Sequence, residues 1–179
     1  MGARAPENTA ADFPDALDVG IADALFQPLA VIPAPGGPVL HMLRPHSPLL
    51  PDFTAGFGEI YFSEVLPGAV KAWKRHSRQT QLFAVPRGLL KIVLYDDRPG
   101  SPTCGALREL ALGRPERYGL LRIPLGVWYG FTALGKEAAL ICNCADIPHD
   151  PAEGERRPPD DPAIPYDWES AARADEHWA

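Results

Sequence analysis

The sequence predicts an all-β fold, a sandwich or barrel of many short strands, and two features of the chain point to it. Short apolar runs recur between residues 59 and 144, and turn signals separate them. Proline is frequent, at 21 of 179 residues, and proline favours strands, turns and loops over long helices. The runs do not alternate with long helical segments, so we expect one β domain without internal repeats.

The elements follow one another along the chain in a simple order. Residues 1–20 are polar and rich in turn formers, and we expect a flexible N-terminal arm there. The domain proper spans residues 21–168 and opens with an apolar stretch over 21–32 and a turn cluster over 33–38. The predicted strands then cover residues 59–65, 69–75, 81–85, 89–95, 107–112, 120–123, 127–134 and 138–144.

The C-terminal part has a different composition. Residues 148–165 are rich in proline and charge, which predicts an extended segment that wraps over the surface of the domain. The tail over 169–179, directly after Trp168, is expected to contribute a short C-terminal helix.

Composition and charge exclude several classes of protein. The net charge of −6 argues against a nucleic-acid partner, because such proteins neutralise phosphates with positive charge. No apolar run approaches the roughly 18 residues that a membrane span needs, and the first residues lack the apolar core of a secretory signal. The cysteines Cys104, Cys142 and Cys144 fit no disulfide framework and indicate a reducing, cytoplasmic location.

One stretch has the spacing of a cupin metal-binding motif but not its ligands. Between Gly68 and Gly88, the positions where the motif carries two histidines and a glutamate hold Lys74, His76 and Gln81. In the second cupin motif, Pro-x-Gly-x-x-His, the final histidine position holds Tyr129. Only His76 remains as a good metal ligand, so we expect no metal and no other cofactor.

Five segments, in this order, resemble the dTDP-4-dehydrorhamnose 3,5-epimerase family of sugar-modifying cupins. They are GEIYFSEV (58–65), PGAVKAW (67–73), VLYDDRPGSPT (93–103), IPLGVWYGF (123–131) and DDPAIPYDW (160–168). The resemblance implies a double-stranded β-helix, or jelly-roll, barrel that forms a homodimer. It also implies a polar pocket inside the barrel that binds a nucleotide-linked keto-sugar, such as a dTDP-sugar, without a metal.

The resemblance also implies where the family's catalytic groups fall, and this chain departs from the pattern. The family's histidine base lies in an Arg-Gly-x-His run that aligns with residues 71–74, so Lys74 takes its position. Tyr129 replaces the histidine of the Ile-Pro-x-Gly-x-x-His segment. The catalytic tyrosine is expected near Cys142, where none is present, and Asp161 is the candidate partner of the base.

The residues themselves suggest proton transfer beside a carbonyl group. On a strand, Lys74 and His76 share one face, so both point into the barrel if one does. A desolvated lysine has a lowered pKa and becomes a usable base, a neighbouring histidine relays protons near neutral pH, and a tyrosine hydroxyl stabilises an enolate. We therefore predict Lys74, His76 and Tyr129 as catalytic residues. Substrate contacts are predicted for Lys71, Gln81, Cys142 and Asp161.

Structural alternatives stand beside these roles. Lys74 would equally pair with a carboxylate or bind a ligand anion. His76 would be a hydrogen-bonded residue of the pocket, and Tyr129 would be a packed aromatic residue of the core. Two functions remain open. One is an epimerase, isomerase or cyclase acting on a nucleotide-linked keto-sugar or a natural-product intermediate, and the other is a non-catalytic binding protein for such molecules. A metal-dependent oxygenase has only the motif spacing in its favour.

Overall fold

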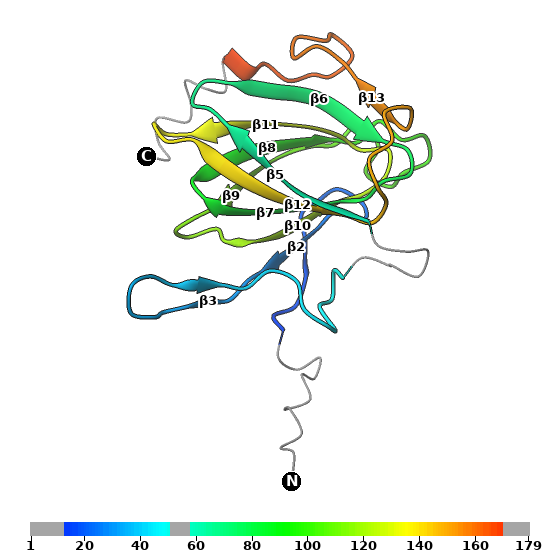
Figure 1. Cartoon of the computed structure of the whole chain (residues 1–179). Helices are drawn as coiled ribbons and strands as arrows, with labels where there is room; N and C mark the ends of the chain where they lie inside the picture. The colour runs from blue at the N-terminus through cyan, green and yellow to red at the C-terminus, as the bar shows by residue number, and fades with distance from the viewer. Residues whose placement is uncertain (1–12, 51–57, 170–179) are drawn as a thin grey trace.

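Two antiparallel sheets face each other in the computed structural model, which describes residues 13–50 and 58–169 (Figure 1). One sheet has the strand order β1 (Leu17–Asp18), β2 (Leu25–Pro28), β10 (Gly119–Ile123), β7 (Gln81–Arg87), β12 (Ala139–Ala145) and β5 (Glu59–Val65). The other has the order β13 (Gly154–Arg156), β6 (Val70–His76), β11 (Trp128–Leu134), β8 (Leu89–Tyr95) and β9 (Leu107–Gly113). A hairpin of β3 (Val31–Ile32) and β4 (Val39–Leu40) stands off from the barrel in Figure 1.

The predicted all-β class is confirmed, and the eight long strands β5 to β12 match their predicted spans to within two residues at each end. The sequence did not predict β1 to β4 or β13. Of the expected N-terminal arm, residues 1–12 lie outside the described part, whereas Leu17 and Asp18 pair with β2. The expected C-terminal helix falls almost wholly in residues 170–179, also outside the described part, and only Trp168 and Glu169 are seen in a helical turn.

The main core fills the space between the two sheets. Alternate residues of β8 on one sheet and β10 on the other point inward, among them Leu90, Ile92 and Leu121, and all are fully buried. Tyr129 and Phe131 of β11 belong to the same cluster. The long strands are held in register because apolar side chains recur every second residue on their inner faces.

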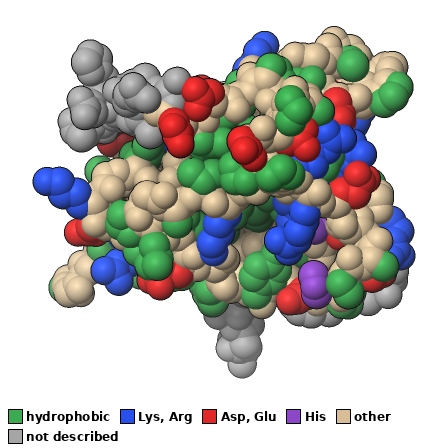
Figure 2. Space-filling view, turned by 90° about the horizontal axis from the view of Figure 1, so that it is seen from above, with side chains coloured by type: hydrophobic (Ala, Val, Ile, Leu, Met, Phe, Trp, Pro, Cys, Tyr) green, Lys and Arg blue, Asp and Glu red, His purple; other side chains and the backbone are tan. Residues whose placement is uncertain are grey.

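The outer face of the five-stranded sheet is covered by the chain that follows β13, so the predicted wrap is confirmed. Trp73 and Arg157 exchange backbone hydrogen bonds of 2.7 and 3.1 Å, and the Trp73 indole donates to the carbonyl of Pro159. Ile164 and Trp168 then pack on Trp73 in a separate buried cluster. In Figure 1 this segment lies over β6, and in Figure 2 basic and acidic side chains are interspersed on the same face.

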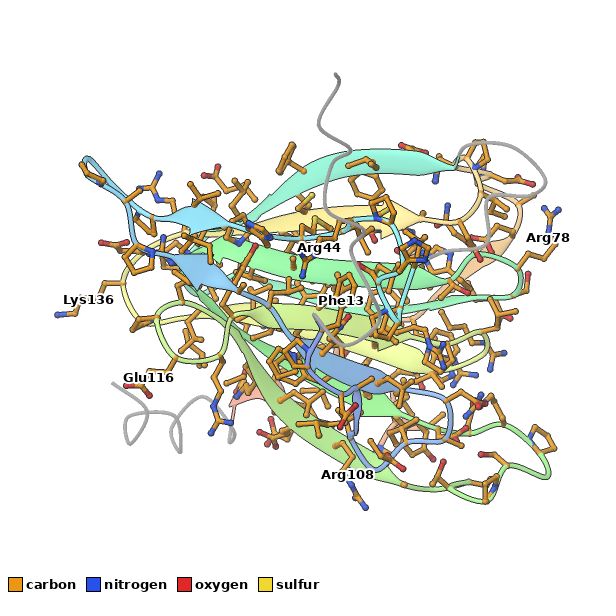
Figure 3. All side chains as sticks on the ribbon, turned by 90° about the horizontal axis from the view of Figure 1, so that it is seen from below. Phe13, Arg44, Arg78, Arg108, Glu116 and Lys136 are labelled. Carbon is orange, nitrogen blue, oxygen red and sulfur yellow. The ribbon has the colours of Figure 1, made fainter. Side chains whose placement is uncertain are left out.

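The outer face of the six-stranded sheet is covered by the segment that follows the β3–β4 hairpin. Met42, Leu43 and Leu49 pack against a cluster that includes Leu120 and Cys144. From below, Arg44 and Phe13 lie near each other in Figure 3, with the guanidinium carbon 4.3 Å from the ring centroid. In the described ranges, no helix has the length and hydropathy that crossing a lipid bilayer requires.

A buried carboxylate organises the loop between β8 and β9. Asp96 is fully buried and accepts hydrogen bonds from the Arg98 guanidinium and from the hydroxyls of Ser101 and Thr103, at 2.6 to 2.9 Å. Burial alone would raise the pKa of Asp96, but these hydrogen bonds outweigh it and hold the pKa well below its usual range. The motif residues over 96–103 are therefore structural.

Candidate active site

A cavity of about 540 Å³ lies between the two sheets. Its walls come from strands β5, β7 and β12 on one side and β6, β11 and β13 on the other. The residues that line it are Tyr61, Ser63, Val70, Lys71, Ala72, Trp73, Lys74, Phe83, Tyr129, Phe131, Ile141, Asn143, Arg156 and Arg157. This combination of aromatic surface with several polar and charged groups is typical of a site for a small anionic molecule.

Tyr129 connects the cavity to a buried histidine and a buried glutamate. His76 Nε2 lies 3.0 Å from the Tyr129 hydroxyl, and His76 Nδ1 contacts Glu153 Oε1. All three side chains are almost completely buried. Lys74 and Tyr129 are direct neighbours across β6 and β11, and Arg156 is the partner of Lys74 on β13.

Glu153 is fixed by the backbone of the turn that follows β6. Its Oε2 atom accepts hydrogen bonds from the amides of Ser77, Arg78 and Gln79 at 3.1 to 3.3 Å. Burial alone would raise the pKa of Glu153, but the hydrogen bonds from His76 and these amides hold it below its ordinary value. Burial is also the largest effect on His76 and lowers its pKa despite the carboxylate beside it. At neutral pH the pair is therefore an ionised Glu153 and a neutral His76.

A second hydrogen-bonded chain reaches the opposite wall. Gln79 accepts a hydrogen bond from Gln81 Nε2 at 2.7 Å, and Gln81 Oε1 accepts one from Asn143 Nδ2 at 2.6 Å. Asn143 Nδ2 also donates to the Tyr61 hydroxyl at 2.8 Å. Because the Gln79 amide binds Glu153, one buried arc of polar groups runs from Tyr129 to Tyr61. The Tyr61 oxygen accepts a hydrogen bond from Asn143, which leaves the Tyr61 hydroxyl proton free to be donated to a ligand.

Two cationic side chains, those of Lys74 and Arg156, face the cavity. Within the described residues, neither side chain forms a salt bridge or a side-chain hydrogen bond. Burial lowers the pKa of Lys74, and the nearby charge of Arg156 lowers it further, whereas Glu153 acts in the opposite direction. Lys71 also lines the cavity, but its amine donates to Ser63 Oγ and to the Glu64 carbonyl at 3.1 and 2.7 Å.

The structure places the predicted site residues in three groups. Lys71, Lys74 and Tyr129 line the cavity. His76 and Gln81 lie behind its wall and reach it through Tyr129 and Asn143.

The third group, Cys142 and Asp161, was predicted to contact the substrate, but neither side chain lines the cavity. Cys142 lies between Ile141 and Asn143, which both face the cavity, and strand alternation turns its side chain to the outer face of the sheet. Asp161 pairs with Arg157 at 3.3 Å and with the Ala163 amide, not with the group at position 74. It serves to close the turn after β13.

The basic side chains of residues 71–78 point in different directions. Arg75 points away from the cavity and pairs with Asp97 and Glu155 at 3.0 and 2.9 Å. Arg78 points outward at the edge of the molecule in Figure 3 and pairs with Asp150. Of the basic side chains in this stretch, Lys71 and Lys74 line the cavity. They are three positions apart, and both reach it because the register between β6 and β11 shifts between the pairs Lys74–Tyr129 and Lys71–Phe131.

Sequence reasoning missed Glu153, Tyr61, Asn143 and Arg156. Tyr61 and Ser63 sit at alternate positions of a correctly predicted strand, so the period of two could have identified them. Glu153 follows a proline-rich loop, and nothing in the sequence links it to His76. Within residues 13–50 and 58–169, no group of three or more His, Cys, Asp or Glu side chains is arranged to hold a metal ion.

The sequence and the fold of this chain were compared with those of known proteins. The family profile described as dTDP-4-dehydrorhamnose 3,5-epimerase matches residues 66–179. The chain belongs to this family. A solved structure of a dTDP sugar isomerase from Desulfovibrio desulfuricans G20 is 57% identical, with a TM-score of 0.82, and the match covers 86% of this chain and 96% of that one. The predicted cupin jelly-roll barrel is confirmed by the family match and this likeness.

More distant relatives share part of the chain. A probable low-salt glycan biosynthesis epimerase of Haloferax volcanii is 40% identical over 108 residues, which are 60% of this chain and 65% of that relative. The spore coat polysaccharide biosynthesis protein SpsL of Bacillus subtilis is 32% identical over 119 residues, or 65% of this chain and 78% of that protein. A structure of a Legionella pneumophila 3,5-epimerase in complex with dTDP-4-keto-L-rhamnose has a TM-score of 0.72 at 23% identity, covering 86% of this chain and 82% of that one, and shows the shared fold.

Proposed function

We propose that this protein is an isomerase that moves a proton at a carbon beside the ketone of a nucleotide-linked keto-sugar. The single observation that carries the proposal is the cavity between the sheets, which presents hydroxyl groups on both walls and two cations without a salt-bridge partner among the described residues. The related structures support the substrate class, because their names specify a dTDP sugar isomerase and an epimerase bound to a dTDP-keto-sugar.

The cations suit the nucleotide part of such a substrate. A diphosphate carries negative charge at neutral pH, and Lys74 and Arg156 would meet it from neighbouring strands. Neither cation is engaged in a salt bridge within the described residues, so both are available to the anion. Binding of the anion then raises the pKa of Lys74, since it offsets the repulsion from Arg156. The affinity for a dTDP-sugar should therefore fall as the ionic strength rises.

The two walls suit epimerisation, in which a proton leaves one face of a carbon and returns to the other. Lys74 and Tyr129 supply the proton-transfer group on the wall of the five-stranded sheet. Tyr61 on β5 faces them with a hydroxyl proton available for donation, and it sits beside Asn143 on β12. We assign Tyr61 the part played by the tyrosine that the family carries near position 142.

Proton exchange tests the proposal directly. The protein is incubated in deuterium oxide with a dTDP-4-keto-6-deoxy sugar, and NMR follows the C–H groups beside the ketone. We expect enzyme-dependent exchange of deuterium into at least one of these positions, and the Lys74→Met and Tyr129→Phe variants separate binding from exchange. Binding of the sugar with no exchange above the background rate would show a binding protein and overturn the proposal. A natural-product intermediate remains the alternative substrate if no nucleotide sugar binds.

The assembly and the location of the protein are further parts of this proposal. Apolar side chains are exposed on the β3–β4 hairpin and on the outer face of β5, including Ile32, Val39 and Phe62, which is 65% exposed. A second copy of the chain covering these residues would form the homodimer that the family resemblance implies. Sedimentation of the purified protein tests this, with a Phe62→Lys variant expected to weaken the dimer. Three free cysteines, Cys104, Cys142 and Cys144, support a reducing cytoplasm.

A further inference from the structure

We propose that the hydroxyl oxygen of Tyr129 accepts the substrate proton, with His76 as the group that takes over the tyrosine's own proton and Glu153 as the positioning residue for His76. This inference rests on the proposed function and specifies which side chain of the wall is the base. It reverses the prediction from the sequence, in which a lysine was the base and the tyrosine an acid.

The direction of the hydrogen bonds carries the argument. One oxygen of Glu153 accepts hydrogen bonds from three backbone amides, and this favours the ionised carboxylate. The proton in the contact between Glu153 and His76 is therefore carried by His76 Nδ1. In a neutral imidazole Nε2 is then an acceptor, and the Tyr129 hydroxyl donates to it across 3.0 Å. The lone pairs of Tyr129 are left for the cavity.

The transfer step then balances within the chain. The substrate C–H bond breaks, its proton forms a new O–H bond on Tyr129, and the former hydroxyl proton of Tyr129 moves to His76 Nε2. The electron pair of the C–H bond becomes an enolate on the substrate oxygen. Both transfers have to occur together, because burial raises the pKa of Tyr129 well above its ordinary value and a free tyrosinate would not form. The resulting imidazolium lies beside the ionised Glu153, which stabilises it.

A second, smaller cavity of about 90 Å³ leaves space for water beside His76. It shares Lys74 and Arg156 with the main cavity and is further lined by His76, His149, Asp150, Pro151, Glu153 and Gly154. The space is large enough for a few water molecules at about 30 Å³ each. After Tyr61 has protonated the enolate, His76 returns its extra proton to Tyr129, which releases the proton taken from the substrate to water, and Tyr61 regains a proton from water, so that both walls return to their starting states.

Lys74 occupies the same wall but lacks these features. Among the residues that the structure describes, its amine has no hydrogen-bond partner to receive a proton, and its neighbour Arg156 is another cation. A position beside Arg156 favours binding of an anion over uptake of a proton. Loss of Lys74 should therefore weaken binding more than it slows the exchange step, whereas loss of Tyr129 should do the opposite.

Exchange kinetics with a dTDP-4-keto-6-deoxy sugar in deuterium oxide separate these two residues. We expect Tyr129→Phe to lower the exchange rate at saturation by about 10² to 10⁴ with little change in sugar affinity. We expect Lys74→Met to raise the KM more than it lowers kcat. A Tyr118→Phe variant, which loses a hydroxyl outside the cavity, is the matched control. If Tyr129→Phe exchanges at the wild-type rate while Lys74→Met does not exchange at all, the lysine is the base and the inference is wrong.

The pH profile tests Glu153 as a positioning residue. Glu153, Tyr129, Lys74, His149, Asp150 and Arg156 are the titratable and charged groups that contact His76 or line the small cavity with it. Removing one negative charge by Glu153→Gln lowers the pKa of His76, so the acid limb of kcat should move to lower pH while kcat itself falls by about tenfold or more. A purely structural glutamate would leave the position of this limb unchanged, and that result would exclude the proposed role.

The protonation state of His76 is a test that needs no substrate. In protein labelled with ¹⁵N at histidine, the His76 signals are identified by their loss in His76→Gln. We expect a protonated Nδ1 and an unprotonated Nε2 near pH 7.5. The opposite tautomer would overturn the inference whatever the enzyme does. Absence of exchange with every nucleotide keto-sugar would instead refute the proposed function, and the spectrum would still decide how Tyr129 and His76 share their proton.

Discussion

Replacing Tyr61 by phenylalanine should separate catalysis from stability more cleanly than any other change in the cavity. The substitution removes one hydroxyl oxygen and keeps the aromatic ring in the wall. That oxygen accepts a hydrogen bond from Asn143 at 2.8 Å, and its own proton faces the space between the sheets. The change therefore removes the proton donor assigned to the wall opposite Tyr129.

The structural cost of this change is small. Asn143 Nδ2 keeps its hydrogen bond to Gln81 at 2.6 Å, so only one of its two partners is lost. Loss of one such bond lowers the free energy of unfolding by about 0.5–1.5 kcal/mol. For a chain of 179 residues this corresponds to a fall in Tm of about 1–6 °C. Loss of a general acid, by contrast, lowers kcat by about 10² to 10⁴, or roughly 3–5 kcal/mol of activation free energy.

Tyr118→Phe is the matched control for the assay. Its hydroxyl donates to the carbonyl of His41 at 2.9 Å, and its side chain belongs to the cluster on the outer face of the six-stranded sheet and not to the cavity lining, so the same atom is lost with a similar fall in Tm. Thermal unfolding and steady-state turnover of a dTDP-4-keto-6-deoxy sugar are measured for both variants. We expect full turnover in Tyr118→Phe only. If Tyr61→Phe keeps more than a tenth of the wild-type kcat, the assignment of Tyr61 as the opposite-wall acid is refuted.

Three further predictions follow from contacts described above. Asp96→Asn should lower the free energy of unfolding by about 3–5 kcal/mol in urea titrations, because the Arg98 guanidinium loses its buried partner. The pKa of Asp96 is lowered in the fold, so this stabilisation is present above about pH 4 and is lost as the pH falls towards the folded-state pKa. The variant should lack this dependence, and an equal change of the free energy of unfolding with pH in the wild type and the variant would contradict the prediction. Arg156→Ala should weaken dTDP binding about tenfold in calorimetry and reduce its salt dependence, and an unchanged affinity would remove Arg156 from the anion site. Cys142→Ala should keep turnover within about twofold of the wild-type value, because the side chain lies on the outer face of β12. A 10²-fold loss of turnover would show that this side chain does act in the cavity.

The long strands were predictable because their signal is local. A strand such as β8, Leu89–Tyr95, is a run of apolar and β-branched residues with a single charge, Lys91, and Gly88 before it has a φ of 74°, which favours glycine at this turn. The strands β1, β3 and β4 are only two residues long. They form because the neighbouring sheet or hairpin supplies partners, and no periodicity can appear over two residues.

The candidate site was predictable only where strand alternation decides it. Lys74 and Tyr129 sit at fixed positions of two motifs, and the pleat turns both inward. Glu153 and Asp161 depend instead on how a loop of many residues folds back across β6. The carboxylate that reaches His76 comes from that loop, 77 positions further along the chain, and the sequence carries no signal for such a distant contact.

The arc from Tyr129 through Glu153, Gln79 and Asn143 to Tyr61 holds both hydroxyls through contacts within the protein. Val70 and Ala72 line the same cavity and contribute no side chain to this arc. Changes at these two positions would alter the shape of the space that receives a sugar while the hydrogen-bonded arc stays intact. A lineage built on this frame is free to diversify its substrates by surface-lining mutations alone, with the chemistry inherited unchanged.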